Sequence, residues 1–208
     1  VMIITIDGLS GVGKSTIAKA LSQELGYDFV STGQIYRMLA LLILDEEIVP
    51  EDTTAVVERI DELSLLCEDH VLVTNYKTDN GRLECEETAY VAALIGKNRI
   101  CKKRLSERII KMVQGKNCVV EGRNAGNILF PNAELKIYLY ADIEIRVKRK
   151  LHWLTSTSAS MERNRLNIRD KFVASSAPED AYKIDTGNKT VAETLQEILE
   201  HMNSVLYS

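Results

Sequence analysis

The stretch from Gly8 to Ser15 reads Gly-Leu-Ser-Gly-Val-Gly-Lys-Ser, and it constrains this 208-residue chain more than any other segment. It follows an apolar run at residues 2–6 and precedes a helical pattern of apolar residues that closes at Gly26. A glycine-rich loop between a strand and a helix lets backbone N–H groups turn inward around an anion, and the helix dipole favours the same anion. The segment therefore predicts a phosphate-binding loop (P-loop), with a plain glycine turn before a helix as the alternative.

The predicted nucleotide site is this loop with the first residues of the helix. It comprises Gly8, Leu9, Ser10, Gly11, Val12, Gly13, Lys14, Ser15 and Thr16. In loops of this kind the lysine reaches the β- and γ-phosphates, and the hydroxyl that follows it binds Mg²⁺. We therefore expect ATP as the phosphoryl donor, Lys14 as a catalytic residue and Ser15 as a ligand of the metal.

Other segments separate the classes of P-loop protein. A GTP-binding protein would need an Asn-Lys-x-Asp segment to read its base, but the chain carries Asn-Lys-Thr-Val at residues 188–191. The apolar run at residues 118–120 ends in Glu121-Gly122-Arg123, where many ATP-driven motors carry an aspartate. Both features favour a kinase for a small molecule.

Short apolar runs alternate with helical patterns along the chain, and they predict an α/β fold. After the first run, similar runs lie at residues 118–120, 135–139 and, more weakly, 182–184, with a closing helical pattern at about 191–206. Alternation of this kind indicates parallel strands joined by crossover helices. We predict a single domain over residues 1–208, with a five-stranded parallel sheet flanked by helices.

Two segments interrupt this alternation and are interpreted as insertions. The first, about residues 33–115, is mainly helical, with a β-hairpin expected where residues 71–73 and 82–85 flank Asp-Asn-Gly at 79–81. The second, about residues 146–180, concentrates basic side chains, for which a solvated helix face is the alternative to a ligand-binding role. These side chains are Arg146, Lys148, Arg149, Lys150, Arg163, Arg165, Arg169 and Lys171.

Composition narrows the classes of function and location. The net charge of −4 argues against a broad nucleic-acid footprint, because binding to a phosphate backbone needs a basic surface. No apolar run reaches the roughly 18 residues of a membrane span, and the first residues lack the pattern of a signal peptide. The four cysteines include no C-x-x-C pair, which favours reduced thiols over a zinc site or a disulfide framework. We expect a cytoplasmic monomer that binds neither nucleic acid nor membranes.

Four segments match one enzyme family in order. They are residues 6–16, residues 31–37 (Ser-Thr-Gly-Gln-Ile-Tyr-Arg), residues 120–123 (Val-Glu-Gly-Arg) continuing to 130–137 (Phe-Pro-Asn-Ala-Glu-Leu-Lys-Ile), and residues 180–186, which begin Asp-Ala and end Ile-Asp-Thr. In these segments the chain resembles bacterial cytidylate kinases, which are P-loop nucleoside monophosphate kinases. The resemblance implies transfer of the γ-phosphoryl group of ATP to CMP or dCMP, giving ADP and CDP or dCDP. It also implies that the first insertion binds the acceptor nucleotide and that the second is a short lid.

The resemblance assigns roles to individual residues. Acceptor-binding positions are Asp7, Thr32, Tyr36, Arg37, Arg99, Arg123, Asn124 and Asp170, and catalytic positions are Lys14, Arg123, Arg169 and Asp170. In the family the two arginines matching Arg37 and Arg123 bind the acceptor phosphate, and the aspartate matching Asp170 binds its ribose. Structural salt bridges are the alternative for both arginines, helix packing for Tyr36, and a surface acid for Asp170. For Asp7, a purely structural role competes with one near the acceptor or a Mg²⁺-bound water.

The departures from the family pattern concern the acceptor base and the lid. Asn124 stands where the family has an aspartate that reads cytosine, and the stretch 88–92 offers no serine for the base, although Arg99 replaces the family arginine if one residue is inserted before it. In the lid, two expected arginines align with Leu166 and Val173. The alternatives are therefore a P-loop kinase for another small acceptor, such as UMP, shikimate or a sugar acid, and a non-catalytic ATP-binding switch protein.

Overall fold

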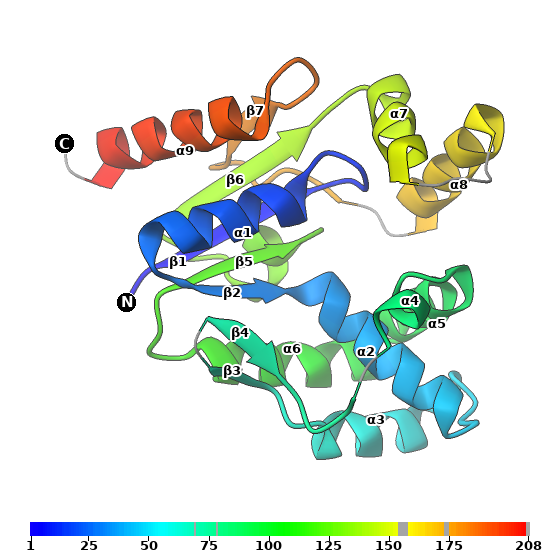
Figure 1. Ribbon diagram of the computed structural model, residues 1–208. Helices are drawn as coiled ribbons and strands as arrows, with labels where there is room; N and C mark the ends of the chain where they lie inside the picture. The colour runs from blue at the N-terminus through cyan, green and yellow to red at the C-terminus, as the bar shows by residue number, and fades with distance from the viewer. Residues whose placement is uncertain (69, 78, 154–157, 173–174, 207–208) are drawn as a thin grey trace. The chain divides into compact units, whose positions relative to one another are not determined.

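The computed structural model describes residues 1–68, 70–77, 79–153, 158–172 and 175–206 (Figure 1). In the described chain strands alternate with helices, except that two or three helices follow one another in three places and two strands follow one another in one. The strands are β1 (Ile3–Gly8), β2 (Asp28–Ser31), β3 (Leu66–Glu68), β4 (Val71–Val73), β5 (Cys118–Gly122), β6 (Leu135–Tyr140) and β7 (Tyr182–Asp185). The helices are α1 (Lys14–Leu25), α2 (Thr32–Asp45), α3 (Thr53–Glu62), α4 (Asn80–Leu83), α5 (Glu86–Lys97), α6 (Arg99–Val113), the π-helix η1 (Ala125–Leu129), α7 (Ile143–Trp153), α8 (Ala159–Phe172) and α9 (Val191–Leu206).

Five strands form a parallel sheet in the order β2-β5-β1-β6-β7, which confirms the predicted α/β class. β1 pairs in parallel with β5 on one side and with β6 on the other, and β6 pairs with β7. The weak apolar run at residues 182–184 is the strand β7. The central strand β1 is buried on both faces: Ile4 and Ile6 on one face and Thr5 on the other are fully buried, as an inner strand of a parallel sheet requires.

The chain separates into two compact units. The first contains Val1–Tyr27 and Asn117–Ser208, and the second contains Asp28–Lys116. In the first unit α1 packs against β1, β5 and α9. The apolar residues Ile17, Ala18 and Leu21 of α1 are buried at the helical spacing that the sequence pattern predicts.

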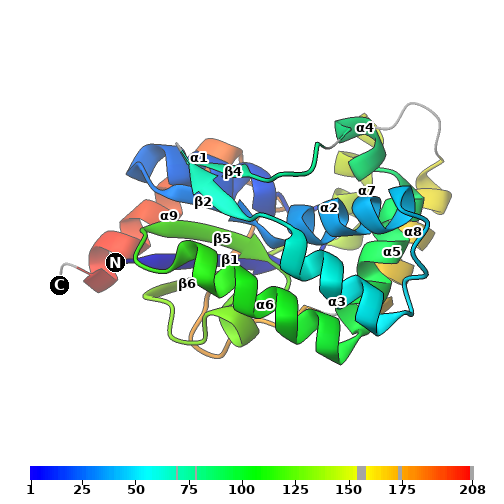
Figure 2. The same ribbon diagram turned by 90° about the horizontal axis from the view of Figure 1, so that it is seen from below.

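The second unit is mainly helical (Figure 2). α2 packs against α3 and α5, and α6 packs against α3 and α5. α2 is apolar around most of its circumference, and Leu39, Ala40 and Leu41 are buried at consecutive positions. A helix that is apolar on all sides needs neighbours on several sides, and the other helices of this unit supply them.

The hairpin expected around Asp79-Asn80-Gly81 is wrong. The antiparallel pair in this unit joins β3 to β4, and its connection contains His70, which has a positive φ of 65°. Residues 80–83 instead form the short helix α4, whose N-cap Asp79 accepts a hydrogen bond from the backbone of Gly81. Gly81 lacks the positive φ that a two-residue hairpin turn needs, so helix capping by the aspartate prevails over the turn preference of Asn-Gly.

In the predicted lid region, α7 and α8 pack against each other. Leu166, which aligns with an expected lid arginine, is fully buried and belongs to the core of this pair. Val173, the other such position, lies outside the described residues.

All four cysteines are free thiols, with Cys85 exposed and the other three buried. Among the residues with described structure, no helix combines the length and the apolar character that a membrane crossing requires.

Candidate functional site

The glycine-rich loop connects the end of β1 to the start of α1, as its sequence predicts. Two of its glycines are required by geometry. A Cβ atom on Gly8 would lie 2.3 Å from the backbone oxygen of Leu139 on β6, so only glycine allows this close approach. Gly11 has a φ of 84°, in the left-handed region, and its added Cβ would lie 3.1 Å from the Cβ of Arg146. The loop is therefore folded tightly against the elements behind it.

Lys14 opens α1 and turns back over the loop. Its Nζ donates a hydrogen bond to the backbone oxygen of Leu9 at 2.7 Å. Burial lowers the pKa of Lys14 to about 8, while the carboxylates of Glu121 and Asp7 act in the opposite direction. An anionic ligand beside this lysine would stabilise its protonated form, because a nearby negative charge offsets the loss of hydration that burial imposes on the ammonium group.

Ser15 and Glu121 bring a hydroxyl and a carboxylate together beside this lysine. The Ser15 hydroxyl donates to Oε1 of Glu121 at 3.1 Å, and Glu121 is only 4% exposed at the end of β5. Mg²⁺ prefers hard oxygen ligands of this kind, so both residues fit a magnesium site. Glu121 is absent from the predicted site, although its place at the end of a buried strand next to β1 could have identified it.

Asp7, a predicted acceptor-binding residue, uses both carboxylate oxygens within the protein. Each accepts a backbone hydrogen bond of 2.7 Å, one from Ala125 and the other from Gly126. Asp7 is fully buried, and burial raises its pKa although both hydrogen bonds act against the rise. Both contacts are structural, which is one of the two roles expected for Asp7. They fix the start of η1, directly after Arg123 and Asn124.

Arg123, Arg146 and Asp170 form a charged cluster. Arg146 lies 2.9 Å from Oδ2 of Asp170, and Arg123 lies 3.9 Å from Oδ1. Oδ1 of Asp170 is buried and accepts no hydrogen bond from the described residues. Arg146 is 6% exposed, so a solvated helix face does not describe this arginine. The cluster brings together the predicted residues Arg123 and Asp170 and adds Arg146.

Asn124, the departure from the family's base-reading aspartate, contacts the segment that follows α8. Its side-chain oxygen accepts a hydrogen bond from the backbone of Ser176 at 3.4 Å. The hydroxyl of Ser175 donates to the backbone oxygen of Arg123, the residue before Asn124. Part of the acceptor capacity of Asn124 is thus used within the protein.

The remaining predicted acceptor residues belong to the second unit. Thr32 is buried at the start of α2, and Arg99 is exposed at the start of α6. Arg37 pairs with Glu84 at 2.6 Å and donates to the backbone oxygen of Leu83 at 3.1 Å. Arg37 therefore makes a structural salt bridge, the alternative to a role in binding phosphate. Because the Glu84 side chain is 69% exposed, this ion pair is expected to be weak.

Tyr36 has the surroundings of a packing residue. A Cβ on Gly96 of α5 would lie 3.7 Å from Cε1 of the tyrosine, in ordinary van der Waals contact. Burial raises the pKa of Tyr36 to about 12. The ring therefore contributes to the packing of α2 against α5, whatever its part in ligand binding.

Three of the basic residues of the second insertion, Arg163, Arg165 and Arg169, are arginines of α8. Arg163 pairs with Glu144 of α7 at 2.5 Å, and Arg165 lies 3.7 Å from Glu162. Arg169 lies in the last turn of α8, next to Asp170, and is partly buried. Of the three, Arg169 is the one adjacent in sequence to Asp170 of the charged cluster.

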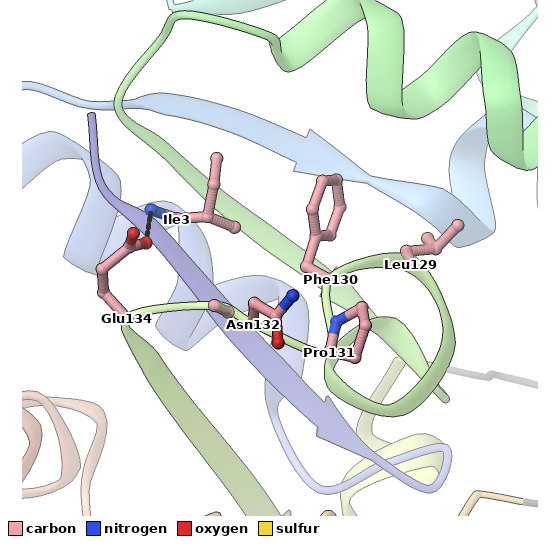
Figure 3. Close-up of a pocket in the computed structure, with 7 residues that line it drawn as sticks. Ile3, Leu129, Phe130, Pro131, Asn132 and Glu134 are labelled. Carbon is pink, nitrogen blue, oxygen red and sulfur yellow. Dashed lines mark hydrogen bonds between the residues drawn. The ribbon is translucent and has the colours of Figure 1, made fainter.

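A small pocket lies at the other end of the strands, beside the start of β1, and is separate from this site (Figure 3). It lies beside Ile3 at the start of β1, whereas the P-loop follows the end of that strand. Phe130 and Pro131 line it, and Glu134 accepts a hydrogen bond from the backbone of Ile3. Its volume of about 210 Å³ is below the range of about 300–1,000 Å³ that is typical of ligand pockets.

Solved structures share the fold of this chain. A gluconokinase from Sinorhizobium meliloti aligns with a TM-score of 0.53 at 16% identity, covering 99% of this chain and 95% of that one. An uncharacterised protein from Eubacterium ventriosum aligns with a TM-score of 0.54 at 19% identity, covering 98% of both chains. Together with the loop between β1 and α1, these likenesses identify a P-loop kinase fold.

Sequence relatives define the family more narrowly. The chain is 34% identical to the cytidylate kinase of Chlamydia trachomatis serovar A over 95% of this chain and 96% of that protein. It is also 34% identical to the cytidylate kinase of a Thermotoga species over 97% of this chain and 98% of that protein. The family model described as cytidylate kinase matches residues 4–204, a span that holds the loop, the charged cluster and the predicted acceptor residues. The chain therefore belongs to the cytidylate kinase family.

Proposed function

We propose that this protein transfers the γ-phosphoryl group of ATP to CMP or dCMP, giving ADP and CDP or dCDP, with Mg²⁺ as cofactor. The observation that carries the proposal is the match to the cytidylate kinase family over residues 4–204, with the P-loop and its lysine in place. Family membership implies ATP as the donor, and the loop geometry supplies the means to bind it.

The donor half of the proposal rests on Lys14, Ser15 and the loop amides. A bound triphosphate would give the Lys14 ammonium a stronger partner than the Leu9 carbonyl that it contacts without ligand. Mg²⁺ would be held by the Ser15 hydroxyl, with the Glu121 carboxylate beside it, and would neutralise charge on the phosphates. Glycine amides that point at the phosphates complete the electrostatic stabilisation.

For the acceptor half, we propose Arg37 and Arg123 as ligands of the nucleotide phosphate. Two guanidinium groups match the charge and the planar geometry of a phosphate dianion. The buried Oδ1 of Asp170, which accepts no hydrogen bond from the described residues, suits a ribose hydroxyl. Thr32, Tyr36, Arg99 and Asn124 would complete the site around the sugar and the base.

No protein nucleophile is required. An oxygen of the acceptor phosphate forms the new bond to the γ-phosphorus, the bond to the β–γ bridging oxygen breaks, and ADP leaves with that electron pair. The work of the protein is therefore alignment and charge neutralisation, to which Arg169 and Arg123 contribute. Closure of the predicted lid, about residues 146–180, would exclude water and suppress hydrolysis of ATP.

Asn124 favours a second acceptor, UMP. A carboxylate accepts hydrogen bonds only, whereas an amide presents a donor and an acceptor and can meet either pyrimidine. We expect UMP to be phosphorylated with one-tenth to one-hundredth of the efficiency for CMP, on the order of the ~1 to 3 kcal/mol of one base contact.

We also propose that the protein works in the cytoplasm as a monomer and does not bind nucleic acid. Four free thiols suit a reducing compartment, and the net charge of −4 opposes binding to a polyanion.

The experiment that tests the proposed function is an acceptor screen with coupled detection of ADP. Purified protein receives MgATP with CMP, dCMP, UMP, shikimate or gluconate. The proposal predicts the highest kcat/KM for CMP or dCMP and a lower value for UMP. Turnover with shikimate or gluconate alone would assign a different acceptor, and ATP binding without acceptor-dependent turnover would indicate a switch protein.

A further inference from the structure

Three consecutive backbone carbonyls of the P-loop accept hydrogen bonds from side chains of the first unit. The oxygen of Ser10 accepts from Arg146, and the oxygens of Gly11 and Val12 both accept from Nη1 of Arg149, at 3.3 Å in the first case and 3.4 Å in the other two. The hydroxyl of Thr186 donates to the same Val12 oxygen at 2.7 Å. Three consecutive carbonyls of the loop thus have side-chain donors.

These bonds determine where the loop amides point. In a trans peptide the C=O and N–H groups lie in one plane and point in opposite directions. Holding the carbonyls of Ser10, Gly11 and Val12 toward α7 and the turn after β7 therefore directs the next N–H groups the other way. Those N–H groups belong to Gly11, Val12 and Gly13, and inward-pointing amides are what a phosphate-binding nest consists of.

Arg149 and Thr186 act as one unit in this arrangement. The Thr186 hydroxyl accepts from Nη1 of Arg149 at 3.0 Å while it donates to Val12, and Nη2 of the arginine donates to the backbone oxygen of Thr186. Thr186 is 3% exposed, and its hydroxyl is engaged on both sides, accepting from Arg149 and donating to Val12. Only a guanidinium group offers enough donors in a fixed plane to serve all these acceptors together.

We propose that Arg149 and Thr186 are positioning residues for the phosphates of the donor nucleotide, acting from behind the P-loop by orienting its amides. They act through the loop backbone and need no contact with the nucleotide. The inference deepens the proposed function and rests on it, because the ligand is the polyphosphate of the donor site.

The test compares Arg149→Met and Thr186→Val with wild type by calorimetric titration of MgADP, inorganic pyrophosphate and CMP. Both substitutions keep the approximate volume and remove the donors. We expect the Kd of MgADP and that of pyrophosphate to rise by about tenfold, as for loss of a charge-assisted hydrogen bond, and the Kd of CMP to stay within about twofold. In ¹H–¹⁵N spectra of the ligand-free variants, the amide signals of Gly11, Val12 and Gly13 should shift.

Matched controls separate this role from general effects of charge and stability. Lys148→Met removes one positive charge from the exposed side of the same helix and should leave all three affinities unchanged. Thr186→Ser keeps the hydroxyl and should restore MgADP affinity to within about twofold of wild type. Thermal unfolding of every variant reports whether the fold is retained.

Three outcomes would overturn the inference. A fall in thermal stability with unchanged Kd for pyrophosphate would make the contacts merely structural. A rise in Kd for MgADP but not for pyrophosphate would place Arg149 at the nucleoside. An effect of Arg149→Met that Thr186→Val does not share would make the arginine a direct ligand. If wild-type protein bound neither MgADP nor pyrophosphate, the proposed function itself would fail.

Discussion

The hydroxyl of Ser15 and the carboxylate of Glu121 are joined by a hydrogen bond of 3.1 Å, although the two residues are 106 positions apart in the sequence. The parallel register of β1 with β5, in which Ile6 lies opposite Glu121, brings them together at the edge where the P-loop begins. A buried acid thus orients the hydroxyl proposed to bind the metal.

This contact predicts a specific defect in metal use. Glu121→Gln should raise the Mg²⁺ concentration for half-maximal rate by about tenfold, the lower end of the loss seen when a group that orients a metal ligand is removed. A Mg²⁺ titration at fixed ATP measures the effect. Glu134→Gln, at the opposite end of the sheet, is the control and should leave the titration unchanged. An unaltered Mg²⁺ requirement in Glu121→Gln would remove Glu121 from the metal site.

The pKa of Lys14, about 8 in the ligand-free protein, predicts a pH dependence. Only the protonated ammonium attracts the phosphates, and its population falls as the pH rises through the pKa. We expect kcat/KM for ATP to decline above about pH 8, while kcat holds to higher pH because bound phosphates raise the pKa of the lysine. Steady-state rates at pH 6 to 10 test this, and a flat profile for kcat/KM over that range would contradict the role of Lys14.

The pairing of Arg37 with Glu84 predicts competition between the glutamate and the acceptor phosphate. Arg37→Ala and Arg123→Ala should each raise KM for CMP and lower kcat, because a misplaced phosphate costs both binding and alignment.

Glu84→Gln removes the carboxylate that competes with the acceptor phosphate for Arg37. It should lower KM for CMP by about twofold to fivefold, as expected for an exposed ion pair. Steady-state kinetics with each substrate varied in turn would distinguish the subsites. A change confined to KM for ATP would assign the arginines to the donor.

Asn124 predicts relaxed discrimination between bases. Its side-chain oxygen accepts from Ser176, an interaction that an aspartate can also make, so Asn124→Asp should preserve the local fold. The substitution should widen the ratio of kcat/KM for CMP over UMP by about tenfold, or ~1.4 kcal/mol. Competition assays with both nucleotides measure this ratio directly. A ratio that stays flat or narrows would mean that Asn124 does not read the base.

The parts of the molecule that the sequence predicts well are those specified by local patterns. The P-loop and the strand before it follow from spacing within 15 residues, and the weak run at 182–184 is a strand because a parallel sheet buries short apolar segments. The Asp-Asn-Gly turn fails for a local reason as well, since Asp79 caps a helix instead. There, two local preferences compete and composition alone does not decide between them.

The groups behind the P-loop could not be located from sequence. Arg149 is one of several basic residues in its segment, and Lys148 beside it is exposed, so charge does not tell them apart. Thr186 contacts a residue 174 positions away. Such contacts depend on how β7 and α7 are placed next to the loop, which only the tertiary structure defines.

The most direct measurement of the central claim follows the phosphorus atom. Protein incubated with ATP labelled at the γ-phosphate and with CMP should yield labelled CDP, and the Lys14→Ala variant, folded as judged by thermal unfolding, should yield none because the phosphates lose their principal cation. Lys19→Ala, an exposed lysine of the same helix, should match wild type. Label that appears only in inorganic phosphate, or labelled CDP formed equally well by Lys14→Ala, would contradict the account.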